Sequence, residues 1–95
     1  MHVISYRALR EFGETHPAAR TPLRAWHKVA QKAAWTNLAD VRQTYPSADA
    51  VEGLTVFNIG GNKYRLIVSI NYQAQVIYIK HVLTHEEYDE ENWKT

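Results

Sequence analysis

The sequence predicts an α+β fold, in which N-terminal helices pack on a small, mainly antiparallel β-sheet and a short C-terminal helix follows. In the first half, apolar residues recur every three or four positions, the spacing of an amphipathic helix. From Leu54 onward they follow the pattern of strands, and turn residues separate the runs. Helices followed by an antiparallel meander are typical of α+β domains. A chain of 95 residues is predicted to form a single domain, residues 1–95.

The composition is that of a globular protein, with 45% apolar and 22% charged residues. No apolar run approaches the length of a membrane span, and the first residues do not form a secretory signal. Cysteine is absent, which excludes disulfides, thiol catalysis and thiolate metal sites. We therefore expect a soluble, cytoplasmic protein with no membrane partner.

Three helices are predicted in the first half. Residues 2–5 alternate as in an N-terminal strand, and a first helix follows until Gly13 and the His16-Pro17 pair break its pattern. A hydroxyl followed by proline, Thr21-Pro22, predicts the start of the second helix. Its apolar stripe is flanked by a basic one formed by Arg20, Arg24, His27, Lys28 and Gln31.

The third helix is short. Asn37 is its predicted cap, and the Tyr45-Pro46 pair ends it, because a residue before proline disfavours helical backbone. Residues 47–53 are small or polar and are predicted to form a loop.

Strands are predicted at residues 54–59, 63–71 and 75–83, with a glycine-rich hairpin turn between the first two. Opposing Tyr72 with Gln75 predicts the pairs Ile70–Ile77, Val68–Ile79 and Leu66–His81. This register places a nearly apolar face, which also includes Phe57 and Ile59, against the helices. The other face is then open to solvent, and Arg65 and Lys80 are diagonal neighbours on it; its members are Arg65, Ile67, Ser69, Tyr78, Lys80 and Val82.

The segment THEEYDEENW, residues 84–93, predicts a short helix after the last strand. Thr84 and Glu87 match a capping box, in which each side chain bonds the other residue's backbone N–H. A helix here places His85, Tyr88 and Asp89 on one face, close to Lys80 and Arg65. We expect Asp89 to stabilise the helix rather than to orient His85.

These residue types can cleave RNA. The 2′-hydroxyl of RNA is the nucleophile, so the protein needs an acid, a base and cations for the phosphorane. His85 can serve as acid or base, Arg65 can bind phosphate bidentately and Lys80 adds a point charge. Tyr88 can stack on a base or hydrogen-bond a phosphate oxygen. Each residue also has a plainer explanation. Arg65 and Lys80 could be ordinary exposed charges on a strand, His85 a surface histidine, and Tyr88 a tyrosine that packs against the sheet.

No metal or cofactor site is predicted. His81 and His85 have ligand spacing only if they share one helix, and the five histidines form no cluster. Phosphate-binding loops and dinucleotide fingerprints are absent from the sequence.

Basic residues are concentrated in the first half, where residues 1–45 hold seven Lys or Arg against three acids. Such a surface attracts polyanions. The predicted RNA-binding residues are Arg20, Arg24, Lys28 and Lys63. A solvated helix face or a contact with a protein partner explains the same charges.

The segments MHVIS, VFNIGGNKYRLI and VIYIKHVLTHEEYD together resemble the HigB family of type II toxin–antitoxin systems, within the RelE-like superfamily. The resemblance implies a metal-free mRNA interferase that cuts translated messages in the ribosomal A site. It also implies a cognate HigA-type helix-turn-helix antitoxin and a RelE-like fold.

Within this resemblance, Arg65 matches the superfamily's phosphate-binding arginine, and Lys80 takes the place of a basic residue on the last strand. His85 and Tyr88 stand where RelE-like enzymes keep terminal acid, base or stacking groups. The alternatives are a non-catalytic module that binds RNA or the ribosome, and a protein that only binds a partner chain. Which of His85, Tyr88 and Lys80 is acid or base stays open.

Overall fold

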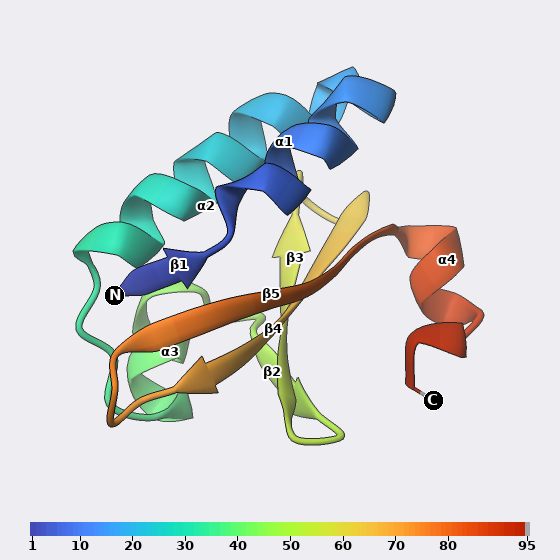
Figure 1. The fold of residues 1–95 in the computed structure, drawn as a ribbon. Helices are drawn as coiled ribbons and strands as arrows, with labels where there is room; N and C mark the ends of the chain where they lie inside the picture. Colours follow the sequence, from blue (N-terminus) through green and yellow to red (C-terminus); the bar gives the residue numbers. More distant parts are fainter. Residues whose placement is uncertain (95) are drawn as a thin grey trace.

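Three helices cover one face of a five-stranded sheet, and a short C-terminal helix lies beyond the end of the last strand (Figure 1). The computed structural model describes residues 1–94. Its elements confirm the predicted α+β class and are β1 (His2–Ile4), α1 (Tyr6–Thr15), η1 (Pro17–Ala19), α2 (Arg20–Lys32), α3 (Leu38–Thr44), β2 (Asp49–Val51), β3 (Leu54–Ile59), β4 (Tyr64–Asn71), β5 (Val76–Thr84), α4 (His85–Asp89) and η2 (Asn92–Lys94). Within residues 1–94 there is no helix with the length and apolar character needed to cross a membrane.

The junction between α1 and α2 differs from the prediction both at Gly13, expected to break the first helix, and at Thr21, expected to start the second. Gly13 does not end α1 but lies buried inside it, and a Cβ there would come within 2.8 Å of the Arg20 Cγ. Thr21 does not cap α2, since η1 runs directly into that helix and α2 begins at Arg20. The Arg20 Nε donates to the Gly13 carbonyl at 2.9 Å and fastens the two helices together.

The connection from α3 to the sheet is partly as predicted. Asn37 caps α3, because its side-chain oxygen accepts from the Asp40 N–H at 2.9 Å, and the helix ends before Tyr45. The loop predicted at residues 47–53 is wrong in part, since β2 forms there and pairs antiparallel with β3. A three-residue edge strand is too short to leave a periodic pattern in the sequence.

The sheet has the order β1-β5-β4-β3-β2, in which β1 runs parallel to β5 and the other pairs are antiparallel. The predicted hairpin turn between β3 and β4 is confirmed, and Gly60 and Gly61 supply its positive φ angles of 63° and 72°. The predicted pairs Ile70–Ile77 and Val68–Ile79 are also confirmed.

A β-bulge then shifts the register, so that Ile67 pairs with His81 and Leu66 pairs with Val82. The prediction that Leu66 opposes His81 is therefore wrong, and Val82 joins the core instead. Arg65 pairs with Leu83, so Lys80 lies three residues from the strand partner of Arg65. The predicted register placed Lys80 two residues from that partner. Arg65 and Lys80 are not the predicted diagonal neighbours.

Two hydrophobic clusters hold the sheet. The larger one joins α1, α2 and α3 to the face that includes Phe57, Leu66 and Ile77. The second lies on the opposite face, where Trp93 packs against Val56 and Ile67. The prediction that this face is open to solvent is therefore wrong at β3 and β4, because the C-terminal segment folds back over it.

Candidate active site

An open cavity of about 390 Å³ lies where three connections of the chain meet. The α1–η1 junction contributes His16, the β3–β4 turn and the start of β4 contribute Lys63 and Tyr64, and the start of α4 completes the lining with Thr84, His85 and Glu86. The backbone N–H of His85 donates to the Lys63 carbonyl at 2.9 Å. The first residue of α4 is thereby held against the β3–β4 turn.

The local sequence around Thr84 fixes His85 at this cavity. The Thr84 Oγ1 accepts from the Glu87 N–H at 3.2 Å, and the Thr84 N–H donates to the Glu87 Oε1 at 2.9 Å. The predicted capping box and short helix are confirmed. The His85 Nδ1 is 3.6 Å from the Asp89 Oδ2, so a protonated His85 has a carboxylate one turn away.

His16 is a cavity residue that sequence reasoning did not select. Its ring stacks on Phe12, with centroids 4.2 Å apart and planes 13° apart, and meets the Tyr64 ring edge-on at 6.0 Å. Its Nδ1 is buried and has no hydrogen-bond partner among residues 1–94. No local motif marks this residue, because the other cavity residues come from distant parts of the chain.

The structure brings Arg65 and Tyr88 together, but away from the lining of this cavity. The Arg65 guanidinium carbon is 5.4 Å from the Tyr88 ring centroid, and Tyr88 stacks on Trp93 at 5.2 Å. Arg65 is only 8% exposed, which contradicts its expected place on an open face. Its guanidinium donates to Asn62 Oδ1 at 2.6 Å, to the Asn62 carbonyl at 3.2 Å and to the Tyr64 carbonyl at 3.1 Å.

Lys80 is separate from both groups. It is the extra residue of the β-bulge in β5, its side chain is exposed, and its Nζ lies 5.8 Å from the Tyr78 ring centroid. Of the four predicted catalytic residues, His85 lies in the cavity, Arg65 and Tyr88 form a second group, and Lys80 stands alone in the described part of the chain.

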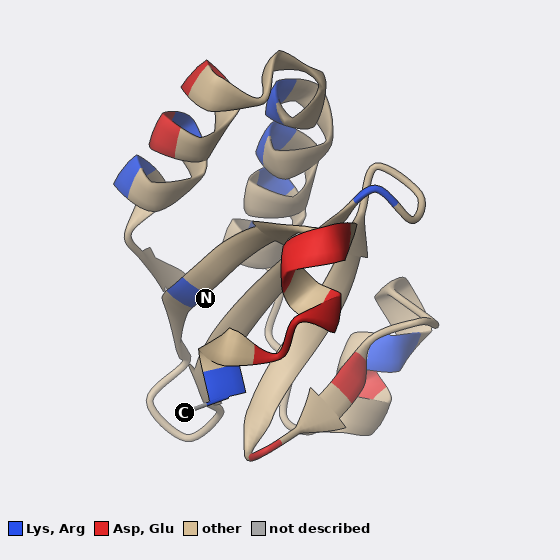
Figure 2. Cartoon of the chain, turned by 90° about the vertical axis from the view of Figure 1, so that its right-hand side faces the viewer, with Lys and Arg blue, Asp and Glu red and all other residues tan. Residues whose placement is uncertain are grey.

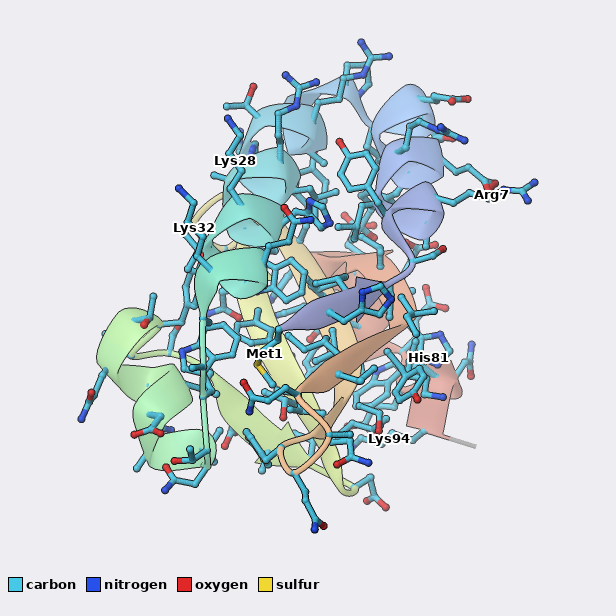
Figure 3. All side chains as sticks on the ribbon, turned by 60° about the vertical axis from the view of Figure 1, so that its left-hand side comes forward. Met1, Arg7, Lys28, Lys32, His81 and Lys94 are labelled. Carbon is cyan, nitrogen blue, oxygen red and sulfur yellow. The ribbon has the colours of Figure 1, made fainter. Side chains whose placement is uncertain are left out.

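The predicted RNA-binding residues lie on two neighbouring elements. Arg20, Arg24 and Lys28 are exposed and four residues apart along α2, and Lys28 projects away from the sheet in Figure 3. Lys63 lines the cavity with His16 and His85. The β3–β4 turn reaches the start of α2, because a Cβ on Gly60 would lie 3.7 Å from Pro22 Cγ.

A smaller cavity of about 220 Å³ lies between α1 and α2, where its lining includes Arg10, Arg20 and Arg24 together with Glu14. His27, expected on the basic stripe, is half-buried against Tyr6, with ring centroids 4.6 Å apart. Burial lowers the pKa of His27, which favours the neutral ring and weakens its contribution to the positive charge of the stripe.

The C-terminal segment is the most acidic part of the described chain, whereas α2 carries basic residues and no acid. Figure 2 shows basic residues along the N-terminal helices and acidic residues gathered on α4 and the segment after it. Glu86 and Glu87 lie in the first turn of α4, where the helix dipole favours negative charge. Among residues 1–94, no three His, Asp or Glu side chains are grouped so that they could hold a metal ion.

Comparison with known proteins identifies the family. Residues 19–91 match the HigB_toxin family, described as the RelE-like toxic component of a toxin-antitoxin system. The chain is 34% identical to the mRNA interferase toxin HigB of Escherichia coli K12 over 92 residues, which cover 94% of this chain and 88% of that protein. It is 27% identical to the mRNA interferase HigB of Escherichia coli O6:H1 over 94% of this chain and 89% of that protein. The chain therefore belongs to the HigB toxin family, the RelE-like toxic components of toxin–antitoxin systems.

Proposed function

We propose that this chain is an endoribonuclease that cleaves translated mRNA. Its relatives in Escherichia coli are named mRNA interferases, which supports the proposal. The observation that carries the proposal is the cavity in which His85 and Lys63 meet, since it offers a proton-transfer group and a cation at one place. A cavity of about 300 Å³ on the covered side of the sheet has no lysine or arginine in its lining, which is His81, Leu83, Glu87, Glu90, Asn92 and Trp93.

The proposed reaction uses the 2′-hydroxyl of RNA as the nucleophile. As the 2′-oxygen bonds to phosphorus, its proton passes to a base, and the bond from phosphorus to the 5′-oxygen breaks as that oxygen receives a proton from an acid. The products are a 2′,3′-cyclic phosphate and a 5′-hydroxyl. His85 can move one of these protons, and the Lys63 ammonium stabilises the charge that develops on the phosphorane.

The remaining predicted catalytic residues take less direct parts in this proposal. Arg65 holds Asn62 of the β3–β4 turn and so positions Lys63, the next residue, through its hydrogen bonds. Tyr88 supports Arg65 by packing against its guanidinium. Lys80, exposed on β5, is proposed to contact a phosphate outside the cavity.

Membership of a toxin–antitoxin family implies an antitoxin partner. We propose further that the antitoxin is a HigA-type helix-turn-helix protein, that cleavage occurs in the ribosomal A site and that the protein acts in the cytoplasm. The basic residues Arg20, Arg24 and Lys28 support binding to ribosomal RNA, because they form one exposed row beside the turn that carries Lys63.

The test is a cell-free translation reaction in which primer extension maps new 5′ ends on a defined message. The wild-type protein is expected to cut the message, and His85→Ala to cut it about 100- to 10,000-fold more slowly. Lys63→Ala should cut more slowly than Lys94→Ala, a control in which the lost lysine is paired with Glu91 at 3.0 Å. Ribosome binding by the wild type without any cleavage would support the non-catalytic alternative instead.

A further inference from the structure

His16 occupies the cavity in a fixed orientation. Its ring is held between the face of Phe12 and the edge of Tyr64, and both of these neighbours belong to or pack against the larger hydrophobic cluster. The residue follows the last turn of α1, where the backbone N–H of His16 donates to the Phe12 carbonyl at 2.8 Å. Main chain and ring are therefore both held in place at the cavity.

Packing alone does not account for a histidine at this position. Its Nδ1 is buried without a hydrogen-bond partner among residues 1–94, which is unfavourable for a polar atom. A phenylalanine could stack on Phe12 without that penalty. A buried polar atom without a partner in a cavity-lining residue makes that residue a candidate for a chemical role. Nδ1 is buried, so Nε2 is the ring nitrogen that can contact a molecule in the cavity.

We propose that His16 is the second acid–base group of the cavity and acts with His85 in RNA cleavage; this inference rests on the proposed function. The Asp89 Oδ2 lies 3.6 Å from the His85 Nδ1, close enough to form an ion pair with the protonated ring. His16 has no such partner at Nδ1. The geometry therefore assigns the base to His16 and the acid to His85.

In this assignment, His16 Nε2 takes the proton of the 2′-hydroxyl while the new bond to phosphorus forms. His85 gives its proton to the 5′-oxygen while the bond from that oxygen to phosphorus breaks. One histidine gains the proton that the other loses, so protons balance and solvent can restore both rings. The charged or titratable side chains around His16 in the cavity are Lys63, Tyr64, His85 and Glu86.

The decisive variant is His16→Phe, which keeps the aromatic stack and removes the titratable ring. Its melting temperature and ribosome association should match those of the wild type, and its cleavage under single-turnover conditions should be about 100- to 10,000-fold slower. The matched control is His81→Phe, because His81 is also a half-buried histidine beside an aromatic ring, 6.4 Å from Trp93, but lies outside this cavity. The control should cleave at the wild-type rate.

Two readouts separate proton transfer from packing. The wild-type cleavage rate should show a bell-shaped pH dependence, with one limb from the base and one from the acid. His16→Phe should lose the limb at acidic pH, where protonation of the base lowers the rate. In His16→Ala, added imidazole should restore part of the cleavage, whereas it should not help His16→Phe, in which the space is filled.

The inference is overturned if His16→Phe cleaves at the wild-type rate with both limbs intact, or if its loss of rate is matched by a loss of melting temperature and imidazole restores nothing to His16→Ala. Failure of the proposed function is a different result, in which the wild-type protein itself leaves the translated message uncut.

Discussion

The guanidinium carbon of Arg65 lies 5.4 Å from the ring centroid of Tyr88, on a face of the sheet that the C-terminal segment covers. The same guanidinium donates two hydrogen bonds to Asn62 in the β3–β4 turn. Arg65 therefore joins the turn that carries Lys63 to the helix that carries His85. Its loss should affect the structure as well as the chemistry.

Arg65→Ala is expected to lower the free energy of unfolding by about 3 kcal/mol, because hydrogen bonds from a charged group and a cation–π contact are lost. Urea denaturation of the purified protein measures the difference. Arg65→Lys is the control for charge, since it keeps the cation but loses the planar fork. An unchanged unfolding midpoint in Arg65→Ala would show that the arginine is not structural.

Thr84→Ala should weaken α4 by about 1 kcal/mol, because the side chain that accepts from the Glu87 N–H is removed. Thr84→Ser keeps the hydroxyl and should retain most of the stability. Hydrogen exchange at the Glu87 amide reports the local effect, and it should speed up in the alanine variant alone. Equal exchange in both variants would mean that the cap does not hold the helix.

Reversing two charges on α2, in Arg24→Glu with Lys28→Glu, should weaken association with ribosomes and reduce its dependence on salt. Each phosphate contact that is lost lowers the salt slope by about one unit. The control is Arg7→Glu on α1, where Arg7 is already paired with Glu11 at 2.9 Å. Ribosome pelleting across a salt series measures both variants, and the cleaved codons should not change. Equal pelleting of the double variant and the wild type contradicts the docking role.

Stability should fall as the pH is lowered through the histidine range, with His27 as a contributor. Burial lowers its pKa below the ordinary value of 6.5, so the unfolded chain takes up a proton more readily than the folded one. This contribution is complete above pH 6.5 and is lost as the pH falls toward the folded pKa. His27→Phe keeps a ring against Tyr6 and should show a smaller drop. The check is the unfolding midpoint in urea at a series of pH values; equal drops in both proteins would exclude His27.

Hydrogen bonds from Thr36 lower the pKa of Asp40 as well, but from an ordinary value of 3.8. The stability that comes from Asp40 is present above that value and is lost only at lower pH. The two effects are therefore separated on the pH axis, and a titration between neutral pH and pH 5 reports on His27 without Asp40.

The sequence predicted those parts of the fold that depend on interactions between residues close together in the chain. The Thr84–Glu87 capping box and the Asn37 cap each involve residues three apart, so their spacing is visible in the sequence. The strands after Leu54 were predicted because their pattern and turns are regular. The bulge at Lys80 was missed, because one inserted residue changes the register and leaves no sign in the pattern of a strand that is apolar on both sides.

The candidate site was predicted only in part, for a related reason. His85 follows a cap that the sequence shows, whereas His16 reaches the same cavity by the packing of distant elements. The guanidinium of Arg65 lies against Tyr88, which stacks on Trp93 of the C-terminal segment, and no residue next to Arg65 in the sequence indicates this contact. Side chains that act together across a fold are joined by tertiary contacts, which a single sequence does not display.

The position of β5 in the sheet has a consequence for how the protein is made. β5 lies between β1 and β4 in the sheet. β1 is synthesised first, but it cannot pair until residues 76–78 of β5 have been made, because β5 is its only partner among the described strands. A chain that stops earlier leaves β1 and β4 with unpaired edges and lacks the α4 wall of the cavity. A chain that ends before residue 76 therefore lacks this cavity, and its unpaired strand edges favour aggregation.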